Sequence, residues 1–233
     1  MGFDMTKTVA VIGSGRMGSF VGRQLPDGIT KIFIDRNEDK AKRLADATGG
    51  DYGLTPDKAR DADVIAILVS EPSVGKVAEE LAGAAKDGAL ILNMSTKGRI
   101  GEEIKKVNPA VSFVDVKIIG NAKVMAMGFP ACAVVSTENP ETVETVRSLL
   151  PGFAKVIQGN PQLVPQVNTI ASKEGIRAAV EIRKQLKQFN LPEDVENIAI
   201  YTVCTGTMMS YVNRDLGEFG RKLADELEKN LTI

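Results

Sequence analysis

The chain has 233 residues, of which 43% are hydrophobic and 25% charged, and its formal net charge is −1. This balance is typical of a soluble globular protein with a substantial core and excludes a disordered chain. With so little net charge and no dense basic stripe interleaved with aromatics, we expect no nucleic-acid partner. We also expect no membrane partner and a cytoplasmic location, because no apolar run is long enough to span a bilayer and no signal-peptide pattern is visible.

The chain contains no histidine, so any proton transfer near neutral pH must use Lys, Asp, Glu, Tyr, Cys, a hydroxyl or water. The two cysteines, Cys132 and Cys204, lie far apart in apolar stretches, which is typical of unpaired thiols in a reducing compartment. No metal-ligand spacing occurs, and we therefore expect no metal site.

The first predicted elements are an apolar strand and a helix joined by a glycine-rich turn. The strand leads into the G-x-G-x-x-G stretch Gly13-Ser14-Gly15-Arg16-Met17-Gly18. Gly13 permits the turn, Gly15 lets a phosphate approach the backbone, and Gly18 lets the helix pack on the strand. The free N–H groups at the helix start then favour a pyrophosphate, so all six residues are predicted to bind a dinucleotide, with Arg16 placed to reach a phosphate.

The motif alone is a weak signal, and the second predicted strand strengthens it. This strand, residues 31–34, ends at Asp35, which stands 22 residues after Gly13. An acid at about that spacing accepts hydrogen bonds from the adenosine ribose hydroxyls and favours NAD. The next residue, Arg36, is able to pair with a 2′-phosphate or to remain a solvated cation, so NAD and NADP both stay open as cofactors.

Further strands and helices alternate along the first two thirds of the chain. We predict helices over 16–25, 37–48, 73–85 and 140–150, and strands over 51–54, 63–70, 89–94, 112–119, 131–137 and 154–157, with a loop at 120–130. This alternation indicates an α/β fold, a Rossmann-type doubly wound and mostly parallel sheet. The carboxyl ends of its strands should surround one site, which adds Val69 and Ser70 to the predicted cofactor contacts.

Polar residues after the later strands are candidates for substrate binding and catalysis. Ser95, Thr96 and Lys97 are able to hold a substrate carboxylate or the nicotinamide amide, or simply to cap a helix. We list Ser95 as a catalytic candidate, and Thr96 and Lys97 as substrate contacts together with Asn121. Asn168, at the start of a long predicted helix, is a further catalytic candidate.

Lys117 is the third catalytic candidate because it lies within an apolar run. If it is buried beside the substrate, its pKa falls and it is able to move protons. The alternative is that its stem is buried while the ammonium group extends to solvent.

The composition changes at about Pro161, after which the pattern is helical over 163–189, 192–213 and 215–230. We therefore expect a dinucleotide-binding domain at 1–160 and a helical substrate and dimerisation region at 161–233. The second region is small for a core of its own. Its apolar faces predict a homodimer formed through these helices.

On these motifs, the first two thirds of the chain resembles the superfamily of β-hydroxyacid dehydrogenase, 6-phosphogluconate dehydrogenase and pyrroline-5-carboxylate reductase, which includes coenzyme F420-dependent NADP oxidoreductase-like proteins. The similarity rests on four stretches, namely residues 13–18, 63–72, 93–96 and 115–120. It implies a dinucleotide-binding fold and oxidoreductase activity.

The chain departs from the catalytic patterns of that superfamily. Where β-hydroxyacid dehydrogenases continue with Ser-Gly-Gly, this chain has Ile119-Gly120-Asn121, and their helical lysine falls on Pro165. The Gly-Pro-Ala dimerisation motif of the reductases is absent, and prephenate dehydrogenases need a histidine that this chain lacks.

We predict an NAD(P)-dependent oxidoreductase that transfers a hydride between the nicotinamide and a small polar substrate: an imine, semialdehyde, hydroxyacid or deazaflavin. Hydride transfer to an imine or a deazaflavin needs the fewest catalytic groups from the protein, because the cofactor carries the hydride and the protein mainly positions the reactants. The alternative is a non-catalytic sensor or scaffold that binds the dinucleotide without turnover. A third hypothesis is another ligand, such as a nucleotide or an adenosyl compound.

Overall fold

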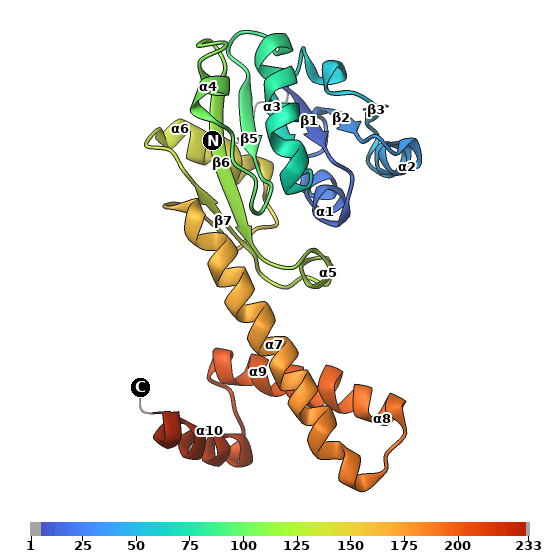
Figure 1. Cartoon of the computed structure of the whole chain (residues 1–233), viewed down its shortest axis with the longest axis vertical. Coiled ribbons are helices and arrows are strands. Elements are labelled where there is room, and N and C mark those ends of the chain that lie inside the picture. Colours follow the sequence, from blue (N-terminus) through green and yellow to red (C-terminus); the bar gives the residue numbers. More distant parts are fainter. Residues whose placement is uncertain (1–5, 232–233) are drawn as a thin grey trace. The chain divides into compact units, whose positions relative to one another are not determined.

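The computed structural model describes residues 6–231, and the chain divides into two compact units between Thr169 and Ile170. The first unit contains the whole β-sheet, and the second consists of helical segments (Figure 1).

The sheet of the first unit has eight strands in the order β3-β2-β1-β4-β5-β6-β7-β8. Strands β1 to β6 pair with one another in parallel, β7 is antiparallel to β6, and β8 is parallel to β7. The predicted Rossmann-type sheet is confirmed. The strands are β1 (Thr8–Ile12), β2 (Thr30–Ile34), β3 (Asp51–Gly53), β4 (Val64–Ile67), β5 (Leu90–Asn93), β6 (Ser112–Ile119), β7 (Cys132–Val135) and β8 (Lys155–Gln158).

The strand order reverses at β1, which pairs with β2 on one side and β4 on the other. In open parallel sheets, ligands bind outside the carboxyl ends of the strands at this reversal. The glycine-rich turn directly follows β1, so the topology places it at the expected binding point.

Each face of the sheet is covered by helices and has its own buried cluster. In β1, Val9 and Val11 face one cluster while Ala10 and Ile12 face the other, and a fully buried side chain of this kind contributes about 1.5–3 kcal/mol. The first face carries α1 (Arg16–Gln24), α2 (Glu38–Thr48) and α6 (Pro140–Leu149). The second carries η1 (Pro56–Ala59), α3 (Glu71–Ala84) and α4 (Glu102–Lys105).

The ends of α2 follow from its capping residues. The Asn37 side chain accepts a hydrogen bond from the Lys40 backbone N–H at 3.1 Å, and Gly49 takes the left-handed conformation that ends the helix. These two residues set the length of the connection between β2 and β3.

Two predictions of local structure were wrong. The predicted loop 120–130 contains α5 (Ala122–Met125), which begins where the Asn121 side chain accepts from the Lys123 N–H. The fourth strand ends at Ile67 rather than Ser70, because the chain bends into α3 with Pro72 in its first turn.

The helical segments predicted after Pro161 are present. They are η2 (Pro161–Leu163), α7 (Val164–Leu186), η3 (Lys187–Phe189), α8 (Glu193–Ile198), η4 (Ala199–Cys204), α9 (Thr205–Asn213) and α10 (Glu218–Leu231). The segment η4 is π-helical, which no residue pattern indicated. No residue between 170 and 230 is buried, and Val212 and Phe219 are both 77% exposed. This unit therefore has no closed core of its own.

Cys132 and Cys204 are both free, as expected, and each is half-buried. Within residues 6–231, no helix is both long enough and apolar enough to cross a bilayer.

Candidate functional site

The three glycines of the turn differ in what surrounds them. Gly13 has a φ of +102°, and a Cβ there would lie 2.5 Å from the Leu68 carbonyl oxygen. A Cβ on Gly18 would lie 1.7 Å from the Gly13 carbonyl oxygen, so α1 packs directly on the turn. A Cβ on Gly15 would meet no atom within 4 Å. Gly13 and Gly18 are thus required by packing, as predicted, whereas the space beside Gly15 is open for a ligand.

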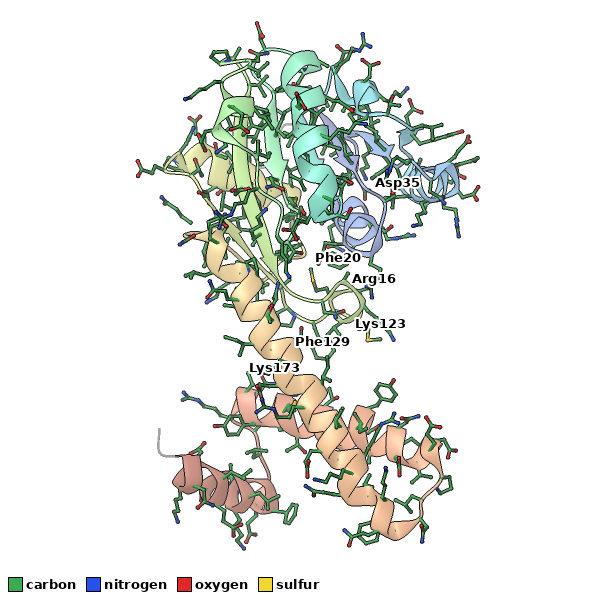
Figure 2. The ribbon with its side chains drawn as sticks, viewed as in Figure 1. Arg16, Phe20, Asp35, Lys123, Phe129 and Lys173 are labelled. Atoms are coloured by element: carbon green, nitrogen blue, oxygen red, sulfur yellow. The ribbon has the colours of Figure 1, made fainter. Side chains whose placement is uncertain are left out.

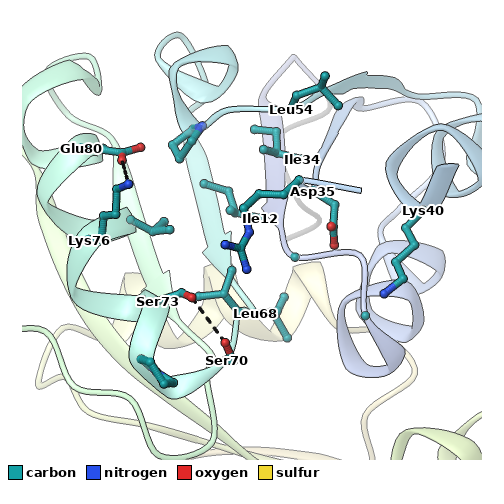
Figure 3. A pocket seen from close by; sticks show the side chains of 17 residues that line it. Ile12, Ile34, Asp35, Lys40, Leu54, Leu68, Ser70, Ser73, Lys76 and Glu80 are labelled. Carbon is teal, nitrogen blue, oxygen red and sulfur yellow. Dashed lines mark hydrogen bonds and ion pairs between the residues drawn. The ribbon is translucent and has the colours of Figure 1, made fainter. Parts of the chain in front are cut away.

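A pocket of about 400 Å³ opens beside this turn, at the carboxyl ends of β1, β2 and β4 (Figure 3). Its apolar wall includes Ile12, Ile34 and Leu54. Of the predicted cofactor contacts, those that line it are Gly13, Gly15, Asp35, Arg36, Val69 and Ser70. The remaining predicted contacts lie around the turn, with Ser14 buried, Gly18 packed against Gly13, Arg16 exposed and Met17 half-buried against the core.

Asp35 lies at the end of β2, and its carboxylate stabilises the turn. Its Oδ2 accepts from the Ser14 N–H at 2.8 Å, and its Oδ1 accepts from the Asn37 N–H at 2.9 Å. Each carboxylate oxygen keeps capacity for a second donor, such as a ribose hydroxyl. The buried Ser14 hydroxyl has no hydrogen-bond partner in the described part of the chain.

Three cations and two acids line the pocket. Lys76 lies 3.9 Å from Glu80 and is thereby partly neutralised. Arg36 and Lys40 are exposed, and neither forms an ion pair among the described residues. The rim of the pocket near β2 therefore carries two cations available to an anion.

The candidate substrate residues lie outside this pocket, on segments that follow β5 and β6. Ser95 is buried, and its N–H donates to Asn93 Oδ1 at 3.3 Å, while Thr96 and Lys97 are exposed. Asn121 is exposed at the start of α5, and Asn168 donates from Nδ2 to the Ile118 carbonyl oxygen at 2.9 Å. Both β5 and β6 end at the same edge of the sheet as the glycine turn.

Lys117 is almost fully enclosed, with its side chain 2% exposed. Its Nζ donates to the Asn93 and Gly98 carbonyl oxygens at 3.2 and 3.0 Å and lies 3.5 Å from Asp115 Oδ1. Burial lowers the pKa of Lys117, an effect that the neighbouring Asp115 opposes. The ammonium group does not extend to solvent, and Lys117 does not line the 400 Å³ pocket.

Two further cations lie beside the glycine turn. Arg16 begins α1 and Lys123 lies on α5, two helices that are in contact, and both side chains are exposed (Figure 2). Lys123 lies two residues after Asn121 but was not predicted as a site residue.

Sequence reasoning also missed Lys40, Lys76 and Glu80 as pocket residues. Each lies on a helix that starts after a strand of the binding edge, α2 or α3. Lys40 could have been found from its position in the first turn of α2, whereas Lys76 and Glu80 lie further along α3. Which turn of a helix reaches the pocket depends on how the helix packs.

Comparison with known families gives one match that covers most of the chain. Residues 8–160 match the model of the NAD-binding domain of 6-phosphogluconate dehydrogenase. The chain belongs to this family. The NAD-binding domain spans every strand of the sheet, and its cofactor is NAD or NADP.

The geometry fits such a dinucleotide. The open space beside Gly15 admits a phosphate to the backbone, the Asp35 carboxylate stands at the end of β2, and the apolar wall suits an adenine ring. The Ser14 hydroxyl, which has no partner within residues 6–231, is a suitable donor to a phosphate oxygen. In the same range, no group of three or more His, Cys, Asp or Glu side chains that could hold a metal occurs.

Individual relatives of the NAD-binding domain are distant. A 4-amino-4-deoxyprephenate dehydrogenase of Streptomyces pristinaespiralis is 28% identical over 120 residues, which are 51% of this chain and 40% of that protein. The chain thus spans about two fifths of the length of this curated relative.

Solved structures share the fold over more of the chain. A pyrroline-5-carboxylate reductase from Coxiella burnetii covers 95% of this chain and 85% of its own, with 15% identity and a TM-score of 0.70. A Plasmodium falciparum pyrroline carboxylate reductase with NADP bound covers 97% and 85%, with 13% identity and a TM-score of 0.68. At these identities, the likeness establishes the fold alone.

Proposed function

We propose that the protein is an NAD(P)-dependent oxidoreductase acting on a small polar substrate. The observation that carries this proposal is the open space beside Gly15 in a domain of the NAD-binding family, with exposed polar side chains on the neighbouring strand ends. When bound, the nicotinamide supplies or accepts the hydride. The chain's own residues then have to hold the cofactor, orient the substrate and exclude water.

The charge at the substrate side supports an anionic substrate. Lys97, Arg99 and Lys123 are exposed on the segments that follow β5 and β6. Ammonium and guanidinium groups bind carboxylates through charge-assisted hydrogen bonds. Thr96, Lys97 and Asn121 are the residues that we assign to this contact.

Among the candidate substrates, a carboxylate-bearing imine is the one that this site suits best. A protonated imine becomes an amine on accepting a hydride alone, whereas a carbonyl also needs a proton. Lys117, a candidate proton donor, is 2% exposed and held by two carbonyl oxygens, and no histidine is present. Ser95 and Asn168 contribute polar contacts in this proposal and no proton transfer.

The direct test is turnover of NADH and NADPH by the purified protein against cyclic imines, semialdehydes, ketoacids and a deazaflavin. We expect oxidation of the cofactor with imines that carry a carboxylate, and at least about tenfold lower kcat/KM with the same imines lacking it. Absence of turnover with every substrate class, despite tight cofactor binding, would contradict the proposal.

That last outcome defines the second candidate function, a dinucleotide sensor or scaffold. It is favoured by the same enclosure of Lys117 and by the Asn168 amide, which is already bonded to the Ile118 carbonyl oxygen. Calorimetric binding of NADH or NADPH without turnover across the panel separates the sensor from the enzyme.

We further propose NADP as the preferred cofactor, because Arg36 and Lys40 line the pocket without an acidic partner among the described residues. In Arg36→Ala, the affinity for NADPH should fall about 10-fold to 100-fold, since a hydrogen bond to a charged group contributes about 1.5–3 kcal/mol. The affinity for NADH should change little. Calorimetric titration measures both affinities, with Arg23→Ala as control, because Arg23 is exposed on α1 and does not line the pocket. Equal losses for both cofactors would overturn this preference.

A homodimer formed through the C-terminal helices remains our expectation, as does a cytoplasmic location. Support for the dimer comes from residues 170–230, none of which is buried. Apolar side chains such as Val212 and Phe219 are 77% exposed there, and a second subunit would cover them. Phe219→Asp should raise the dimer dissociation constant at least about tenfold in sedimentation equilibrium. Lys229→Asp on the same helix is the control. A wild-type protein that stays monomeric at high micromolar concentration contradicts the dimer.

A further inference from the structure

A buried polar cluster joins the ends of β5 and β6 to the segment that follows β5. Asn93 and Asp115 are paired across the two parallel strands, and Asn93 Nδ2 donates to Asp115 Oδ1 at 2.6 Å. The same amide donates to the Gly98 carbonyl oxygen at 2.8 Å. The strand ends and residues 94–100, which we call the β5 loop, therefore form one hydrogen-bonded unit.

Lys117 lies at the centre of this cluster. Its Nζ donates to the carbonyl oxygens of Asn93, the last residue of β5, and of Gly98 within the β5 loop, and it lies 3.5 Å from Asp115 Oδ1. One ammonium group thus holds the end of β5 and the β5 loop together. The Gly98 carbonyl oxygen accepts two hydrogen bonds, one from the Lys117 ammonium group and one from the Asn93 side-chain amide.

The β5 loop is also fixed from the outside. A Cβ on Gly98 would lie 2.3 Å from Val74 Cγ2 of α3, so the loop backbone rests directly on that helix. Ser95, Gly98 and Ile100 are buried, whereas Thr96 and Lys97 between them are exposed. The fixed backbone thereby presents Thr96 and Lys97 at the binding edge of the sheet.

Enclosing an ammonium group is costly, and burial lowers the pKa of Lys117 while Asp115 opposes this and Arg99 adds to it. A methionine would fill a similar volume without that cost. Packing therefore does not explain a lysine at this position, whereas the bonds it makes to the β5 loop do.

We propose that Lys117 is a positioning residue that holds the β5 loop so that Thr96 and Lys97 meet the substrate. It acts through the backbone of Asn93 and Gly98 and does not itself touch the substrate. The expected effect of Lys117 on turnover rests on the proposed function. Its expected effect on the order of the β5 loop rests on the hydrogen bonds alone.

The test is Lys117→Met, followed by native-state trypsin cleavage after Lys97 and Arg99, both exposed on the β5 loop. We expect cleavage at these two bonds to be at least about tenfold faster than in the wild type. The Kd for ADP-ribose, which lacks the nicotinamide, should stay within twofold. The kcat/KM for the imine substrate should fall at least tenfold, mainly through KM.

Lys31→Met is the matched control, because Lys31 is also buried, at 6% exposure, but lies on β2, where its ion-pair partner is Asp27. This variant should lower thermal stability without changing cleavage after Lys97 or Arg99. Faster cleavage in both variants would show that general destabilisation, not positioning, opens the β5 loop.

A double variant, Asp115→Asn with Lys117→Met, separates positioning from charge compensation, and it replaces the single variant if that one does not fold. We expect its loop to stay susceptible to trypsin. Wild-type protection in the double variant would overturn the inference, because Lys117 would then merely neutralise Asp115. The cleavage assay does not depend on turnover. A protein without activity would therefore disprove the proposed function, while the cleavage rates would still decide whether Lys117 holds the β5 loop.

Discussion

Replacing Gly18 by alanine is expected to lower the free energy of unfolding by about 2–4 kcal/mol. The new Cβ would lie 1.7 Å from the Gly13 carbonyl oxygen. The Gly13 backbone is held in place, because the Gly13 N–H donates to the Ile34 carbonyl oxygen at 2.7 Å. The Gly13 carbonyl oxygen is therefore unable to move aside. The helix α1 would have to shift away from β1, which opens the core between Phe20, Val21 and the sheet.

Urea unfolding and thermal melts measure this loss, which for a chain of this size is a decrease in Tm of about 6–12 °C. Gly75→Ala is the control, because Gly75 lies within α3 and a Cβ there would meet nothing within 4 Å. That substitution should raise stability by about 0.5–1 kcal/mol, since alanine is the better helix former. A Gly18→Ala protein as stable as the wild type would contradict the described packing of α1 on the turn.

Replacing Gly15 by alanine should have the opposite pattern, with stability kept and cofactor binding lost. No atom lies within 4 Å of the position a Cβ would take, and the φ of −70° is allowed for alanine. The loss of a favourable N-cap and the smaller entropy of the unfolded chain roughly offset each other, so the net change should be within about 1 kcal/mol. The methyl group would, however, occupy the space through which a phosphate approaches the backbone.

We expect the affinity of Gly15→Ala for NADH and NADPH to fall at least about tenfold, equivalent to 1.4 kcal/mol or more. Calorimetric titration of both cofactors measures this, and a thermal melt verifies that the variant is folded. If the variant binds both cofactors as tightly as the wild type, the dinucleotide does not lie at this turn and the assignment of the pocket is wrong.

Most of the fold could be predicted because buried parallel strands are continuous apolar runs bounded by turn residues. The strand at 112–119 has the predicted bounds, and the helix predicted over 37–48 is present as α2. Helix α5 was missed, since a helix of four residues has no periodicity to detect and depends on the Asn121 side chain. The end of β4 was misplaced because Leu68 still bonds to Ile12 while the chain is already turning toward α3.

The part of the candidate site nearest the motif could also be predicted. The spacing of Gly13, Gly15 and Gly18 predicts the role of each glycine in the turn. The place of Asp35 directly after an apolar strand predicts that it lies at the binding edge of the sheet. Lys76 and Glu80 could not be found, because they reach the pocket from a helix whose rotation on the sheet is set by packing.

Taken by itself, the sequence determined the alternation of strands and helices, the glycine-rich turn, the acid after the second strand and the absence of histidine. These are properties of single residues and their near neighbours. Only the tertiary structure decided that Lys117 is enclosed and does not extend to solvent, and that it lies outside the 400 Å³ pocket. The reason is physical: its environment consists of carbonyl oxygens 19 and 24 residues away, brought to it by the parallel pairing of β5 with β6 and the fold of the β5 loop.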